Sequence, residues 1–234
     1  MRLAYERKKN LSVWEGLSGW SLAPYDPDKL IKYFNCLSIK KGYRLSAYQN
    51  QDRGGNGSAW VFVIPLGHTL PQKPPVKVWE FEEGDIKNQS FLSKIYRFSM
   101  RIFPSYRPLP DWAQDDIEPH IEGDGSPLSY FQASMFFREL YELGAMWHCV
   151  WWGHHDLITS IDKLPEKKWN WEQTKPESMF PVVWKDENHK WNVTFYTYDD
   201  MNADFNFHND IFGNGYEFKT CSTMLASHEG IRTP

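Results

Sequence analysis

The sequence predicts an α+β fold, in which one curved, largely antiparallel sheet packs against a long helix, with a shorter helix near the N-terminus. Two segments repeat apolar residues at helical spacing, and several others alternate apolar and polar residues as strands do. Most of these strand-like segments lie in the C-terminal third, apart from the long helix. The chain has 234 residues, of which 41% are hydrophobic, and no linker divides it. We therefore expect residues 1–234 to form a single α+β domain.

The shorter helix is expected at about residues 27–38. Asp26 can cap its first turn, and Pro27 suits the first helical position. The apolar residues that follow at helical spacing are Leu30, Ile31, Phe34 and Leu37. Gly42 then separates this helix from the strand-like residues that follow.

A β-hairpin is predicted after this glycine. Residues 43–49 alternate in polarity and residues 60–64 form a continuous apolar run, which indicates a strand followed by a more deeply buried one. The glycine-rich connection at 51–58 resembles a phosphate-binding loop but has no lysine before its serine, so we expect a hairpin loop with Arg53 available to a ligand. A third strand is expected at 76–82, after a proline-rich connection.

The long helix is predicted at about residues 126–143, after an acidic surface connection at 104–127 that contains at most a short helix. Ser126 and Pro127 repeat the pattern of a cap followed by proline, and Gly144 supplies a left-handed stop. The apolar sector of this helix contains Leu128, Phe131, Met135, Phe136, Leu140 and Leu143.

Two polar residues, Gln132 and Glu139, fall inside this apolar sector. A buried carboxylate must be paired, hydrogen-bonded or protonated, so Glu139 is a candidate for a functional role, with the anchoring of a neighbouring loop as the structural alternative. Glu142 lies beside the sector and follows Arg138 by four residues, so we expect a surface ion pair between these two side chains.

The C-terminal third is predicted to contain strands at residues 180–184, 191–198 and 216–225, with a polar loop between the last two. The polar residues that alternate in this loop, in the manner of EF-hand ligands, are Asp200, Asn202, Asp204 and Asn206. The glycine and the final glutamate of an EF-hand are absent, so a calcium loop is not expected.

Aromatic residues make up 17% of the chain, with 12 Trp, 12 Tyr and 15 Phe. Such side chains fill cores, but Trp and Tyr also form binding surfaces because they combine a flat apolar face with a polar group. The candidates for ligand binding are Trp147, Trp151, Trp152 and Arg53.

The net charge of −4 argues against a generally basic nucleic-acid-binding protein. Residues 1–53 nevertheless hold ten Lys or Arg against five Asp or Glu, so this segment is where a polyanion such as nucleic acid could bind. The three cysteines are widely spaced, and we expect neither a signal peptide nor a membrane-spanning run. A cytoplasmic protein without membrane contact is therefore expected.

The densest group of reactive side chains lies in residues 146–156, which hold three histidines, a cysteine, an aspartate and three tryptophans. In a regular strand His148 and His154 would lie about 20 Å apart, too far to share one metal ion. A transition metal bound by His148, His154 and His155 therefore requires a bend at Gly153 and a further donor. The candidates for that donor are Glu139, His120 and His208.

Cys149 offers a second chemistry in the same segment, because a nearby imidazolium lowers the pKa of a thiol and can then serve as a general base. The partner would be His154, His155 or His208, brought close by the fold. An inert cysteine packed among tryptophans is the structural alternative.

Two classes of function follow. The first hypothesis is a cytosolic binding protein that uses an aromatic-rich surface to hold a protein or a small ligand and has no chemistry of its own. The alternative is a hydrolase-type enzyme, with or without a metal. Its catalytic candidates are Glu139, His148, His154, His155 and Asp156.

Overall fold

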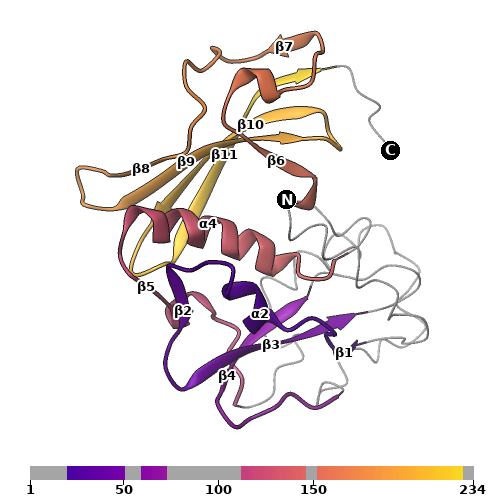
Figure 1. Cartoon of the computed structure of the whole chain (residues 1–234), viewed down its shortest axis with the longest axis vertical. Helices are drawn as coiled ribbons and strands as arrows, with labels where there is room; N and C mark the ends of the chain where they lie inside the picture. The colour runs from indigo at the N-terminus through magenta and orange to yellow at the C-terminus, as the bar shows by residue number, and fades with distance from the viewer. Residues whose placement is uncertain (1–19, 51–58, 73–111, 146–151, 229–234) are drawn as a thin grey trace, which may run out of the picture.

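The computed structural model describes residues 20–50, 59–72, 112–145 and 152–228. Helix α4 (Pro127–Tyr141) crosses the middle of the molecule between two layers, as Figure 1 shows. On one side it contacts strands β8 and β9 of a six-stranded sheet, and on the other it contacts α2, β2 and β4. The architecture is therefore α+β with mostly antiparallel strands. The described strands form three separate sheets, whereas the sequence predicted a single one.

The first sheet contains the predicted hairpin. Strands β3 (Tyr43–Asn50) and β4 (Trp60–Pro65) pair antiparallel, and β1 (Trp20–Leu22) pairs with the other edge of β3. All four residues from Val61 to Ile64 are buried, which agrees with the more deeply buried second strand that the apolar run predicts. The hairpin prediction is therefore confirmed.

The N-terminal helix is shorter than predicted. Helix α2 spans Pro27–Ile31, and the Asp26 carboxylate caps it by accepting a hydrogen bond from the Asp28 backbone N–H. The chain then turns and forms β2 (Leu37–Ile39), which pairs with β5 (Ile121–Gly123) in a two-stranded sheet. Phe34 and Leu37 are buried as their spacing indicates, but pairing with a distant strand replaces the last turns of the helix.

The six-stranded sheet is built from the C-terminal part of the chain. Its strands are β6 (His155–Ile158), β7 (Trp169–Trp171), β8 (Val182–Lys185), β9 (Trp191–Asp199), β10 (Asp204–Phe212) and β11 (Phe218–His228). The order is β6-β9-β10-β11-β7, and β6 and β8 pair with opposite ends of one edge of β9.

Strand β10 overturns the prediction of a polar loop between the last two strands. It lies in the centre of the sheet, paired with β9 and β11 along its length. His208 and Asp210 make this segment look solvent-exposed in the sequence, yet both are buried, because partners from other elements satisfy their polar groups. Of the residues that alternate like EF-hand ligands, Asp200 and Asn202 lie in the turn before this strand, and Asp204 and Asn206 lie in the strand itself.

Helix α4 begins where the sequence predicts. The Ser126 hydroxyl accepts a hydrogen bond from the Ser129 backbone N–H, and Gly144 adopts a left-handed conformation with φ of 71° just after the helix ends. Leu128, expected in the apolar sector, is 52% exposed, whereas Phe137 outside that sector is buried. Because the helix lies between two layers, its neighbours bury residues around much of its circumference and not only along one apolar stripe.

The acidic connection before α4 contains the short 3-10 helix η4 (Glu118–His120) and then β5, in agreement with the short helix allowed there. The strand predicted at 76–82 lies outside the described residues. Among the described residues, no helix is both long enough and apolar enough to cross a membrane.

Candidate functional site

The sequence-predicted site is only partly within the described structure. Trp147, His148, Cys149 and Trp151 lie outside it, as does Arg53. Glu139, Trp152, His154, His155 and Asp156 are described. Glu139 lies on α4. The short 3-10 helix η6 (Trp152–His154) leads directly into β6, and together they place Trp152, His154, His155 and Asp156 beside the C-terminal half of β9.

The buried carboxylate near the end of α4 belongs to Glu142. This side chain is 5% exposed, and its two carboxylate oxygens accept hydrogen bonds from the backbone N–H groups of Trp152 and Gly153. The expected surface ion pair with Arg138 is therefore a wrong explanation of Glu142. Glu142 instead anchors the start of η6. Sequence spacing cannot reveal this role, because the donors are backbone N–H groups ten and eleven residues further along the chain.

Arg138 forms a bidentate ion pair with Asp210 of β10. The nitrogen–oxygen distances are 2.5 and 2.8 Å, and the Asp210 side chain is completely buried. The guanidinium also donates to the Ser134 carbonyl and the Thr220 hydroxyl, and it lies over the rings of Phe195 and Trp152 at 4.9 and 5.2 Å. Arg138 thus holds α4 against the sheet rather than facing an open anion site.

His208 lies beside this ion pair on the face of the sheet that α4 covers. Its Nε2 is 2.7 Å from the Thr197 hydroxyl and its Nδ1 is 2.8 Å from the Ser222 hydroxyl. Burial, reinforced by the Arg138 charge, lowers the pKa of His208 to about 3. The neutral ring therefore donates to one hydroxyl and accepts from the other, and it is too weak a base to activate Ser222 near neutral pH.

His154 and His155 contact two successive carboxylates, those of Asp200 in the turn after β9 and Asp199 at the end of β9. His154 Nδ1 is 3.1 Å from an Asp200 oxygen, and His155 Nε2 is 4.0 Å from an Asp199 oxygen. His155 also stacks on Trp152, with ring centroids 5.2 Å apart, and lies 6.1 Å from the His208 ring. The fold therefore brings Trp152, His155 and His208 into one cluster.

Asp156 does not join this cluster. It pairs with Tyr198, whereas His155 pairs with Asp199, and successive strand residues point to opposite faces of a sheet. Within the described part of the chain, no group of three or more His, Cys, Asp or Glu side chains is arranged to hold a metal ion. The metal hypothesis also requires His148, which lies outside that part.

The other polar candidates serve the fold. Gln132 accepts a hydrogen bond from the Cys36 backbone N–H at 2.9 Å and donates to Asn35 at 2.7 Å, so it ties α4 to the chain before β2. His120 is buried, its Nδ1 lies 3.2 Å from the Asp116 carbonyl, and its ring packs on Tyr43. Glu139 is partly buried on α4.

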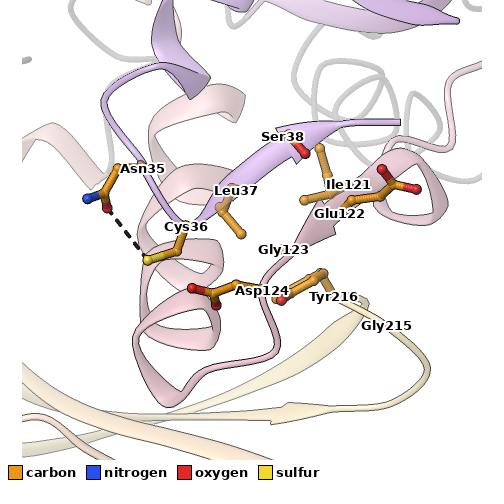
Figure 2. Close-up of a pocket in the computed structure, with 10 residues that line it drawn as sticks. All are labelled: Asn35, Cys36, Leu37, Ser38, Ile121, Glu122, Gly123, Asp124, Gly215 and Tyr216. Atoms are coloured by element: carbon orange, nitrogen blue, oxygen red, sulfur yellow. Dashed lines mark hydrogen bonds between the residues drawn. The ribbon is translucent and has the colours of Figure 1, made fainter. Parts of the chain in front are cut away.

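An open groove of about 650 Å³ lies between the β2–β5 pair and the turn from β10 to β11 (Figure 2). Cys36 and Asp124 face each other there, and burial together with the Asp124 charge raises the pKa of the Cys36 thiol. Hydrogen bonds from Ser126 lower the pKa of Asp124. The thiol is therefore protonated near neutral pH, and the groove presents no activated nucleophile.

An apolar surface lies on the opposite face of the six-stranded sheet. Phe180, just before β8, is 66% exposed, and Val182 and Trp184 of β8 are 51% and 39% exposed. Ile211 of β10 is 37% exposed and shares their face, because Trp184 and Ile211 both pair with Asn192 of β9. We call these four side chains the outer patch. The signal in the sequence was the two-residue spacing from 180 to 184.

Comparison with known proteins does not assign the chain to a family. No protein-family model, curated protein or solved structure matches the chain.

Proposed function

We propose that this chain is a cytoplasmic binding protein without chemistry of its own, and that its outer patch holds an apolar segment of a partner protein that carries a carboxylate. The observation that carries this proposal is the exposure of Phe180, Val182, Trp184 and Ile211 together. Several large apolar side chains exposed in one region of a sheet are typical of an interaction surface. The free thiols of Cys36 and Cys221 suit a reducing compartment.

The register of the strands defines the chemistry of the partner. Trp184, Asn192, Ile211 and Lys219 form one row across β8, β9, β10 and β11 on the outer face. Neighbouring strands lie about 4.8 Å apart, so an extended segment of about five residues crosses from Trp184 to Lys219. Apolar side chains of such a segment would cover Trp184 and Ile211, and a carboxylate would meet the exposed Lys219 ammonium.

The inner cluster supports binding rather than catalysis. The ring nitrogens of His208 are both engaged and its pKa is too low for a general base, while Arg138 and Asp210 satisfy each other. The hydrolase hypothesis stays a prediction, because His148 lies outside the described residues. The nucleic-acid hypothesis also stays a prediction, because residues 1–19 and 51–53 of the basic segment lie outside them, with five of its ten Lys or Arg residues.

Selection from a phage-displayed library of random peptides tests the proposed function. We expect the wild-type chain to enrich peptides with two apolar residues and an acidic one, and the double variant V182S/W184S to lose them. L128S is the matched control, because Leu128 is 52% exposed on α4, about as much as Val182. Equal enrichment on wild type and V182S/W184S, or no enrichment on wild type, would overturn the proposal.

A further inference from the structure

The six-stranded sheet has a long edge that no described strand covers. One edge of β11 pairs with β10 along its length, whereas β7 pairs with the other edge at Ala226, Ser227 and His228 only. The Leu225 carbonyl is already taken by the backbone N–H groups of Glu172 and Gln173. Residues 218–224 therefore present a free edge within the described part of the chain, and residues 219–223 are all exposed.

This free edge has few of the features that keep edge strands from pairing. It contains no proline, its one charged residue is Lys219, and Thr220, Cys221 and Thr223 suit a strand. The bulge in the pairing of β10 with β11 falls at Leu225 of β11, which directly follows the free stretch. An exposed strand edge of this kind is a template for another strand.

We propose that this edge pairs antiparallel with the same edge of a second copy of the chain, about a two-fold axis at Cys221. Cys221 is the midpoint of residues 218–224, so this register pairs the whole free edge. It sets Phe218 opposite Met224 of the second copy, Thr220 opposite Ser222, and Lys219 opposite Thr223. Phe218 and Met224 then form an apolar pair, and Thr220 and Ser222 form a hydroxyl pair, both of kinds that stabilise sheets, while Lys219 meets no like charge.

Neighbouring registers are less favourable. An axis at Ser222 would set Phe218 against Ala226, which β7 already holds. An axis at Lys219 would oppose two ammonium groups, which repel each other. Any shift of the axis away from Cys221 also shortens the paired stretch, so the free edge is best suited to one register.

The pairing has a consequence for the proposed partner surface, although it does not depend on it. Facing residues in an antiparallel pair share a face, so the axis is perpendicular to the sheet. Both copies of α4 then lie on one side of a continuous sheet, and both outer patches lie on the other. The dimer would present two sites on the same side, related by the two-fold axis, which raises avidity where the partner carries two segments.

Oligomeric state tests this inference directly. Light scattering on the full chain is expected to give a dimer for wild type and for C221S, and a monomer for C221K, because two lysines would then meet at the axis. L66K is the matched control: it adds the same charge at a residue that is 61% exposed in the other layer, and it should stay dimeric. Circular dichroism of C221K checks that the fold is retained.

Oxidative trapping tests the register. Facing Cα atoms in an antiparallel pair are about 4.5–5.5 Å apart, within the range of a disulfide. With Cys36 and Cys149 changed to serine, diamide should link two chains through Cys221, and C221S in the same background should not link. A monomeric wild type, or a dimer that survives C221K, would overturn the proposal. Loss of dimer in V182S/W184S alone would assign the contact to the outer patch instead. Peptide selection is read separately, so failure of either proposal leaves the other standing.

Discussion

Each face of the six-stranded sheet carries an exception to the usual distribution of polarity. Beneath α4, the inner face holds the Arg138–Asp210 ion pair and the buried His208. Hydrogen bonds connect the ion pair to the Thr220 hydroxyl and the histidine to the hydroxyls of Thr197 and Ser222. The outer face is covered at one end by the cluster around Ile158, Leu164 and Met179, but at the β8 end it exposes the outer patch. Buried polar groups and exposed apolar groups are the informative exceptions in a fold. The comparison indicates that the polar groups of the inner face serve the fold, whereas the apolar side chains of the outer patch are exposed to water.

Among the variants that test this comparison, the largest loss of stability is expected when the inner ion pair is broken. D210A leaves the Arg138 guanidinium buried without its partner, so the free energy of unfolding should fall by about 3–5 kcal/mol in urea denaturation. R138M/D210L, which replaces both charges by apolar groups, should recover most of that loss. R44A, which removes an exposed hydrogen bond to the His68 carbonyl, is the control and should cost about 1 kcal/mol or less. A D210A variant as stable as R44A would contradict a structural role.

Because His208 is buried, the free energy of unfolding should depend on pH in the acidic range. Its folded pKa of about 3 lies below its ordinary value of 6.5, so the unfolded chain binds the proton more readily. The free energy of unfolding is therefore unaffected by this group above pH 6.5 and falls as pH drops toward 3, with a slope of up to about 1.4 kcal/mol per pH unit.

The variant H208N isolates this contribution, because asparagine can still bond to a hydroxyl but has no proton to gain. The groups that face the ring, Arg138, His155 and Asp210, are unchanged in it. Urea denaturation of both proteins across that pH range should show a shallower slope for H208N. Identical slopes would mean that His208 is not held neutral.

The smallest effect on stability is expected on the outer face. V182S removes a side chain that is 51% exposed and should change the free energy of unfolding by less than about 1 kcal/mol. V193S is the same substitution on the inner face, where Val193 is fully buried, and should cost about 2–4 kcal/mol. Similar losses for both variants would show that the outer face contributes to the core and weaken the proposal that it binds a partner.

Local signals predicted the elements whose partners are close in sequence. Ser126 and Pro127 begin α4 because a cap needs only the next few backbone groups, and the hairpin of β3 and β4 forms from adjacent segments. The helix predicted to residue 38 ends at Ile31 because β2 finds its partner in β5, more than eighty residues later. Apolar spacing in Phe34 and Leu37 predicted their burial, but it could not decide between a helix and a turn followed by a strand.

The candidate site shows the same contrast between features that the local sequence predicts and features that depend on distant contacts. The sequence by itself determined that the chain is α+β and where the long helix begins. Its interpretation of residues 146–156 and of the surplus of aromatic side chains as functional stays a prediction. Only the tertiary structure decided that Glu142 is buried, that Asp210 and His208 belong to a central strand, and that Val182 and Trp184 face water. The physical reason is that a polar residue is stable inside only when its partner arrives from elsewhere in the chain, and which face of a sheet is covered depends on what packs on it.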